Sequence, residues 1–264
     1  MQATVNDIRL SFIDEGKGPA ILFVHGFPLS RGCWRPQIDA LRSQYRCIAP
    51  DLRGFGASEA TPGPVAAVTM DQYADDIAKL VQALGTGPVV LVGHSMGGYV
   101  ALAIAGKHPE ILRALVLVAT RAGQDTPEAA AGRRKTAEAV RTTGTQMVID
   151  AMTPKMIAPS NDSKALLDAV RGFMEPASRD GVIGALLGMA DRPDATPGLA
   201  NIDVPTLVVT GEEDAIIDPG ESQALEQAIP GARLQVIPDA GHFVALEQPE
   251  AFNRELESWL ASVL

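Results

Sequence analysis

Cysteine and long apolar runs are both scarce in this chain of 264 residues. The only two cysteines, Cys33 and Cys47, have a spacing that matches no metal-binding or redox motif. We expect both to be buried, reduced side chains in a cytoplasmic protein. No apolar run approaches the ~20 residues that span a bilayer. Residues 1–7 show no basic segment followed by an apolar stretch, so we expect no signal peptide.

Positive charge is also in short supply, with 22 lysines and arginines against 32 acidic residues. The resulting net charge of −10 argues against nucleic acid or an anionic membrane as a partner. Walker, H-E-x-x-H and calcium-loop patterns are absent, so we expect no metal and no cofactor. The turn Arg53-Gly54-Phe55-Gly56 lacks the third glycine of a dinucleotide loop and is expected to be structural.

What the chain does contain is a regular alternation of short apolar runs and helical patterns. This alternation predicts an α/β fold with a mainly parallel, doubly wound sheet and an antiparallel edge of one or two strands near the start of the chain. The expected strands are Ile8–Asp14, Ile21–His25, Arg46–Ala49, Val89–Gly93, Ala114–Ala119, Thr206–Gly211 and Arg233–Pro238. The expected helices between them are Trp34–Leu41, Met70–Leu84, Ser95–Lys107, Glu221–Ala228 and Pro249–Val263.

The alternation stops between Thr120 and Asn201. This stretch follows the strand Ala114–Ala119, which is the sixth when the antiparallel edge contains two strands. Three or four helices are expected there without intervening strands: Thr126–Gly144, Thr145–Met152, one that starts at 161–163 and carries Leu166 to Phe173, and Ser178–Met189. We therefore predict a core domain formed by residues 1–120 and 200–264. Residues 121–199 are predicted to form a helical lid over the carboxyl edge of the sheet. The basic run Arg133-Arg134-Lys135 is expected to be the solvated face of its first helix.

One serine has the surroundings of a nucleophile. The apolar run Val89–Val92 breaks into Gly93-His94-Ser95-Met96-Gly97, and a helical pattern follows. A strand, a sharp turn with small flanking residues and a helix form the context in which G-x-S-x-G lifts a serine to the edge of a sheet. Two glycines flank a serine by chance in many loops. To identify Ser95 as a nucleophile, the chain must therefore also supply a base, an acid and an oxyanion hole.

His242 is the best candidate base, because it lies in a glycine-containing loop after the last expected strand. The acid should follow the preceding strand, where Asp214 gives the chain order serine, aspartate, histidine. Glu212, Glu213 and Asp218 are its rivals in the same loop. His25 is expected to brace its loop, His94 to point away from Ser95 within the turn, and His108 to cap a helix or face solvent.

An oxyanion hole requires two N–H donors. We expect them from Met96, directly after the serine, and from Phe27 in the loop His25-Gly26-Phe27-Pro28, since proline has no N–H. The substrate pocket is expected to include five apolar side chains: Phe27, Trp34, Met147, Phe173 and Phe243.

Taken together, five motifs in this order resemble the α/β-hydrolase superfamily, and within it the small esterases, enol-lactonases and cofactor-free haloperoxidases or perhydrolases. The motifs are His25-Gly26-Phe27-Pro28, residues 51–58 (Asp-Leu-Arg-Gly-Phe-Gly-Ala-Ser), residues 93–98, Gly211-Glu212-Glu213-Asp214 and Gly241-His242-Phe243. Epoxide hydrolases and haloalkane dehalogenases have a similar first loop but carry aspartate where this chain has Ser95.

These observations predict a serine carboxylic-ester hydrolase that acts through an acyl-enzyme on small to medium, largely apolar esters or lactones, as a monomer or homodimer. Perhydrolysis, carbon–carbon bond hydrolysis and hydroxynitrile lysis use the same three residues and stay open as alternatives. The non-enzymatic alternative is a small-molecule receptor built on a hydrolase fold.

Overall fold

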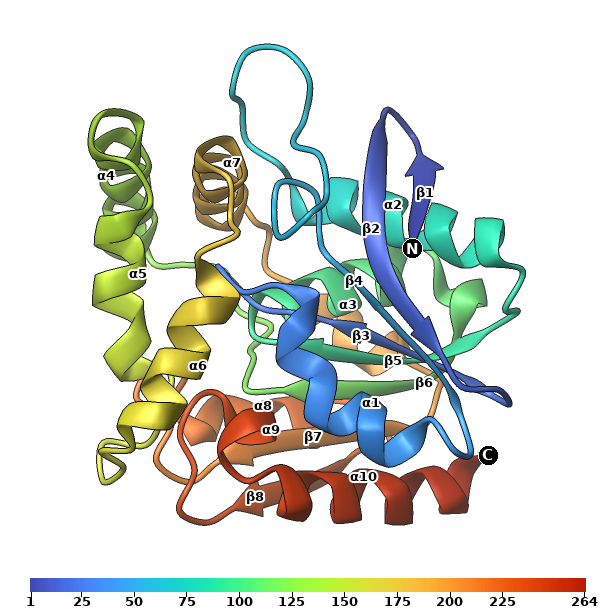
Figure 1. Cartoon of the computed structure of the whole chain (residues 1–264). Coiled ribbons are helices and arrows are strands. Elements are labelled where there is room, and N and C mark those ends of the chain that lie inside the picture. The colour runs from blue at the N-terminus through green and yellow to red at the C-terminus, as the bar shows by residue number, and fades with distance from the viewer.

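The computed structural model describes all 264 residues, and its centre is an eight-stranded sheet (Figure 1). The strands are β1 (Gln2–Val5), β2 (Ile8–Glu15), β3 (Ala20–Val24), β4 (Arg46–Pro50), β5 (Val89–His94), β6 (Leu112–Val118), β7 (Thr206–Gly211) and β8 (Arg233–Ile237). Their order in the sheet is β1-β2-β4-β3-β5-β6-β7-β8. Only the pairs β1–β2 and β2–β4 are antiparallel. The predicted parallel sheet with an antiparallel edge is confirmed.

Helices cover both faces of this sheet, so every residue of its central strands β3 and β5 is buried. One face carries α1 (Arg35–Leu41), α9 (Val244–Glu247) and α10 (Pro249–Val263), and the other carries α2 (Met70–Leu84), α3 (Met96–Lys107) and α8 (Pro219–Ala228). A hydrophobic core lies on each face of the sheet, and strand β3 contributes side chains to both. Ile21 and Phe23 pack on the first face, and Leu22 and Val24 pack on the second. Short 3-10 turns occur at Arg31–Trp34, Pro109–Ile111, Thr153–Lys155 and Thr196–Asn201.

Four helices fill the stretch between β6 and β7: α4 (Pro127–Thr143), α5 (Gln146–Met152), α6 (Lys164–Met174) and α7 (Arg179–Ala190). The hydroxyl groups of Thr126, Ser163 and Ser178 accept backbone N–H groups at the starts of α4, α6 and α7, as N-caps do. These inserted helices gather at one end of the sheet, at the left of Figure 1, where α4 packs against α7.

Helix α7 is attached to the core through glycines. A Cβ at Gly181 would lie 2.1 Å from the carbonyl oxygen of Gly54, and one at Gly188 would lie 1.8 Å from that of Val68. Ser178 Oγ also donates to the Gly54 carbonyl at 2.8 Å. The segment 54–68 therefore packs on α7 backbone to backbone, at a distance that only glycine allows.

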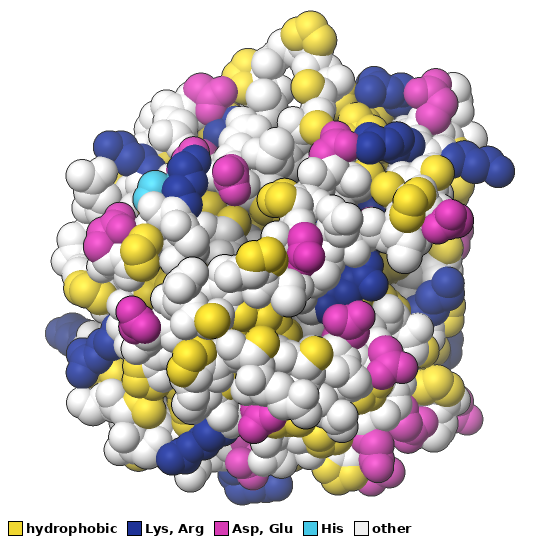
Figure 2. Space-filling view, turned by 180° about the vertical axis from the view of Figure 1, so that it is seen from behind, with side chains coloured by type: hydrophobic (Ala, Val, Ile, Leu, Met, Phe, Trp, Pro, Cys, Tyr) yellow, Lys and Arg dark blue, Asp and Glu magenta, His cyan; other side chains and the backbone are white.

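The surface carries charges of both signs. Figure 2 shows acidic and basic side chains interspersed over the face that α2, α3 and α8 cover. No helix combines the length and the apolar character needed to cross a membrane. Cys33 and Cys47 are buried and unpaired, as expected. Burial raises the pKa of the Cys33 thiol well above its usual range and that of Cys47 to about 12.

Candidate active site

Ser95 sits in a strained turn between β5 and α3. Its φ of +52° lies in the left-handed region, which a residue with a side chain seldom adopts. Gly93 and Gly97 have no room for a side chain. A Cβ at Gly93 would lie 2.4 Å from the Gly97 carbonyl oxygen, and one at Gly97 would lie 2.3 Å from the Val24 carbonyl oxygen. The Ser95 N–H donates to the Val118 carbonyl at 2.9 Å, which ties the turn to β6. The side chain of Ser95 is thereby held at the carboxyl end of β5, half-exposed.

His242 and Asp214, in the loops that follow β8 and β7, form a buried hydrogen-bonded pair. The distances from His242 Nδ1 to Asp214 Oδ2 and Oδ1 are 2.9 and 3.1 Å. Asp214 Oδ1 also accepts the N–H groups of Ile216 and Ile217 at 2.8 and 2.9 Å, which fixes the carboxylate. A carboxylate only accepts, so Nδ1 carries the proton and Nε2 is left with a free lone pair.

The rival carboxylates of this loop have other partners or face solvent. Glu213 accepts a hydrogen bond from the Ser160 hydroxyl at 2.6 Å, and Asp218 caps α8 by accepting the Gly220 N–H at 2.7 Å. Glu212 is exposed. Of the four acidic side chains in this loop, Asp214 is the one hydrogen-bonded to His242.

The other buried histidines have structural partners. His94 Nε2 donates to the His242 carbonyl at 2.9 Å, and its ring stacks on Phe243 with centroids 5.0 Å apart. Burial lowers the pKa of His94 to about 3, so the ring is neutral at physiological pH. His25 Nε2 accepts the Leu52 N–H at 2.9 Å, while Nδ1 donates to the Gly26 carbonyl. His25 therefore braces its loop, as expected.

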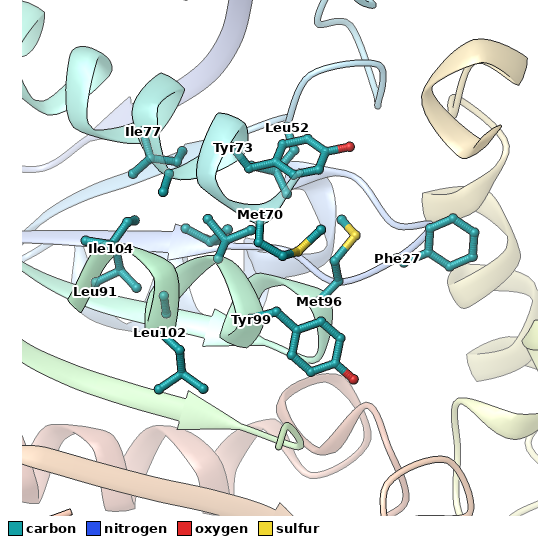
Figure 3. Close-up of a cluster of buried hydrophobic side chains, with 14 of the residues drawn as sticks. Phe27, Leu52, Met70, Tyr73, Ile77, Leu91, Met96, Tyr99, Leu102 and Ile104 are labelled. Carbon is teal, nitrogen blue, oxygen red and sulfur yellow. The ribbon is translucent and has the colours of Figure 1, made fainter. Parts of the chain in front are cut away.

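Two backbone N–H groups are available near Ser95. Met96 is the first residue of α3, so its N–H has no partner within the helix. The N–H of Phe27 makes no hydrogen bond to the rest of the backbone. Its loop lies against the serine, because a Cβ at Gly26 would be 3.0 Å from Ser95 Cβ. In Figure 3 the Phe27 ring points away from the sheet toward α7.

A cavity of about 380 Å³ opens beside Ser95. Its wall is mostly apolar and combines core residues with residues of α4, α5 and α7: Phe27, Ser95, Tyr99, Arg121, Gly132, Arg133, Thr136, Met147, Val148, Ala151, Met152, Leu186, Met189, Ile216 and Ile217. Phe27 and Met147 line it, as the sequence predicts. The loop that holds Asp214 also supplies the side chains of Ile216 and Ile217 to the wall.

Three side chains expected in this pocket lie elsewhere. Trp34 is fully buried in the core, with its ring 5.2 Å from that of Phe23. Phe243 is also fully buried, and its ring stacks on that of His94. Phe173 of α6 packs against the turn at Gly32. Their position in the sequence did not indicate which neighbours they would pack on.

Arg133 also departs from expectation. It was predicted to belong to a solvated face, and its neighbours Arg134 and Lys135 are exposed. Arg133 instead turns into the cavity wall and pairs with the buried Asp125. Arg121 does the same from the segment after β6. Neither arginine belongs to a motif, so nothing in the sequence marked them as pocket residues.

Glu247 is a second residue that the sequence did not reveal. Its carboxylate accepts the N–H groups of Gly241 at 2.7 Å and Ala158 at 3.0 Å, and the side-chain amide of Asn161 at 2.7 Å. Gly241 belongs to the His242 loop, whereas Ala158 and Asn161 belong to the segment before α6. Glu247 therefore fastens the histidine loop to the inserted helices.

The Ser95 hydroxyl and the His242 ring are not hydrogen-bonded to each other in this structure, in which the ring is held by Asp214 alone. Catalytic hydrogen bonds are often long without substrate and tighten when it binds. No group of three or more His, Cys, Asp or Glu side chains is arranged to hold a metal ion.

Known proteins match this chain over nearly its full length. A family model described as the alpha/beta hydrolase fold matches residues 19–249. A thermophilic esterase from Thermogutta terrifontis, whose structure is described as malate-bound, is 42% identical with a TM-score of 0.94, over 100% of this chain and 98% of that one. The enol-lactonase from Burkholderia xenovorans LB400 is 28% identical with a TM-score of 0.90, over 99% and 100%. BpoC of Mycobacterium tuberculosis, provisionally named a non-heme bromoperoxidase, is 31% identical over 97% of this chain and 99% of its own.

Proposed function

Because this chain belongs to the α/β-hydrolase family, we propose that it is a serine esterase in which Ser95 is the nucleophile, His242 the base and Asp214 the residue that orients the base. One observation supports this most directly: Ser95 stands on a strained turn in the wall of an apolar cavity, and a hydrogen-bonded His–Asp pair stands at the same edge of the sheet. The similarity to an esterase and an enol-lactonase supports the ester or lactone bond as the target.

In the first half of the reaction, Ser95 Oγ attacks the ester carbonyl carbon while His242 Nε2 accepts the hydroxyl proton. Asp214 keeps the proton of Nδ1 in place and stabilises the charged ring without taking a proton itself. The N–H groups of Met96 and Phe27 donate to the oxyanion, each contributing about 3 kcal/mol of transition-state stabilisation. When the tetrahedral intermediate collapses, His242 protonates the departing alcohol and an acyl-serine remains.

In the second half, His242 Nε2 accepts a proton from water, whose oxygen attacks the acyl carbonyl. The same two N–H groups hold the new oxyanion. Collapse returns the proton from His242 to Ser95 Oγ and releases the carboxylic acid. One ester and one water are consumed for each acid and alcohol formed, so no further reactant is required.

We further propose that residues 121–199 act as a cap over a core of residues 1–120 and 200–264. Helices α4, α5 and α7 supply most of the cavity wall away from Ser95. A cavity of about 380 Å³ is at the small end of ligand pockets. It therefore suits small esters or lactones with a short apolar body.

The test is covalent labelling followed by a turnover count. A fluorophosphonate probe should add one mass equivalent to the intact protein, and peptide mapping should locate it on Ser95. With para-nitrophenyl butyrate, the protein should release many equivalents of nitrophenol for each active site. Label on another residue would contradict the assignment of the nucleophile. Release of a single equivalent would favour a receptor on a hydrolase fold over an enzyme.

A further inference from the structure

Three arginines surround one carboxylate beside the cavity. Asp125 has a fully buried side chain and pairs with Arg121, Arg133 and Arg192. The distances from its Oδ1 to Arg121 Nη2 and Arg192 Nη1 are 2.7 and 2.8 Å. One carboxylate neutralises only one of the three guanidinium groups, so the cluster keeps a surplus of positive charge.

The surplus faces the cavity. Arg121 and Arg133 are both part of its wall, and no aspartate or glutamate is. Asp125 itself lies behind the wall. The other acidic groups near Arg121 do not form ion pairs with it: Glu221 belongs to the first turn of α8, and Asp71 lines a separate small hollow that Arg121 also borders.

Arg121 also has a hydrogen-bond donor to spare. Its Nε is buried and has no hydrogen-bond partner, although guanidinium N–H groups seldom stay unpaired once they leave water. Arg192 has no such freedom, because its guanidinium is stacked 3.9 Å above the Tyr99 ring and bonded to Asp125. The side chains of Arg121 and Arg133 are 24% and 26% exposed, against 3% for Arg192, so they are the two groups of this cluster that a ligand can reach.

The same cavity leads to the reacting serine. Tyr99 lies one helical turn after Ser95 on α3, and both line the wall together with Arg121. Thr120, the residue before Arg121, donates its hydroxyl to the Ser95 carbonyl at 2.8 Å. A ligand in this cavity can thus have one end at Ser95 and another end near the arginines.

We propose that this site takes esters or lactones that carry a carboxylate, with the reacting carbonyl at Ser95 and the carboxylate at Arg121 and Arg133. The inference rests on the proposed esterase function and names its substrate class. Most of the wall is apolar, so charges there are poorly solvated and an anion is stabilised more strongly than at the surface. The planar guanidinium fork also matches carboxylate geometry. The apolar stem between the two ends would pack on Met147, Val148 and Ile217.

The test compares two esters of equal length, para-nitrophenyl hexanoate and mono-para-nitrophenyl adipate, in which a carboxylate replaces the terminal methyl group. The full-length protein should hydrolyse the adipate ester with a kcat/KM at least about tenfold higher, the smallest effect expected of a charge-assisted hydrogen bond. Arg133→Gln and Arg121→Gln should each lower that preference about 10- to 100-fold. Arg134→Gln is the matched control, because it removes the same charge from the next position on α4, where the side chain faces solvent and pairs with Asp191. It should leave the preference unchanged.

The outcomes separate the two proposals. Hydrolysis of both esters without a preference for adipate would overturn the carboxylate assignment and leave the esterase function standing. Failure to hydrolyse either ester would overturn both. If the arginine variants do not fold, inhibition of the unmodified protein decides: adipate should compete with the hexanoate ester at least about tenfold more strongly than hexanamide. Equal inhibition would contradict the proposal.

Discussion

The sheet edge and the inserted helices hold their functional groups in different ways. At the sheet edge, Ser95 is fixed by backbone contacts that Gly93 and Gly97 permit, and Asp214 is fixed by two N–H groups of its own loop. In the inserted helices, Arg133 is placed by an ion pair with Asp125, eight residues away in the segment that leads into α4. The edge is built by local backbone geometry and the cavity wall by side-chain pairing. Substitutions should therefore abolish the chemistry at the edge and change selectivity or stability in the insertion.

The largest effect is expected at the edge. Ser95→Ala should lower kcat for para-nitrophenyl butyrate about 10⁵- to 10⁶-fold, because the only activated hydroxyl is removed. The melting temperature should change little, since the side chain is half-exposed. Ser160→Ala, on the exposed segment before α6, should keep kcat within about twofold. If S95A turned over the ester at the rate of the unmodified protein, Ser95 would not be the nucleophile and the chemistry would not depend on the sheet edge.

The next largest effect concerns the acid. Asp214→Asn should lower kcat about 10⁴-fold, because an amide does not stabilise the charged imidazole and can favour the wrong tautomer. Glu213→Gln in the same loop loses only a surface contact with Ser160 and should stay within about twofold. Steady-state kinetics of both variants decide between these carboxylates. A greater loss in E213Q than in D214N would assign the role to Glu213.

In the insertion, Asp125→Asn should act on stability. It leaves three guanidinium groups without their shared anion and should lower the free energy of unfolding by about 3 kcal/mol. Asp191→Asn breaks the exposed pair with Arg134 and should cost less than about 1 kcal/mol. Urea unfolding at neutral pH measures both. If D125N and D191N lost the same free energy of unfolding, burial of the Asp125 cluster would contribute nothing to stability.

The same cluster predicts a dependence on pH. Burial alone would raise the pKa of Asp125, but hydrogen bonds from Arg133 and Arg192 outweigh it and lower the pKa to about 2. An unfolded aspartate has a pKa near ~3.9. Because the folded value is the lower one, this stabilisation is complete above pH ~4 and is lost as the pH falls toward ~2. The stability difference between the unmodified protein and D125N should shrink over that range, as acid titration of the unfolding midpoint can measure.

The smallest effect is expected where the two regions meet. Glu247→Gln weakens the acceptor that joins Gly241 of the histidine loop to Ala158. It should lower the free energy of unfolding by about 1–2 kcal/mol and reduce kcat more than it raises KM, since the His242 loop loses its support. Glu250→Gln, exposed at the start of α10, is the control and should cost at most about 0.5 kcal/mol. A change in KM alone would place Glu247 in substrate binding instead.

The contrast also explains what the sequence could reveal. The elbow around Ser95, the start of a helix at Thr126 and the strand alternation depend on neighbours in the chain, so short patterns predicted them. The partners of Arg133 and Glu247 come from other elements, and no local pattern records them. The aromatic residues Trp34 and Phe243 were expected in the substrate pocket but pack in the core against Phe23 and His94, because three-dimensional shape decides these contacts.

The glycines of α7 have a consequence for exchanging parts between related hydrolases. Each glycine in a helix interior is about 1 kcal/mol less favourable than alanine, and Gly181, Gly184 and Gly188 all lie within α7. The close contacts with segment 54–68, far away in the chain, therefore help to offset this cost, in addition to the packing of α7 on α4. Transplanting residues 121–199 alone onto another scaffold should leave α7 frayed. A chimera that also carries residues 54–68 should keep it ordered.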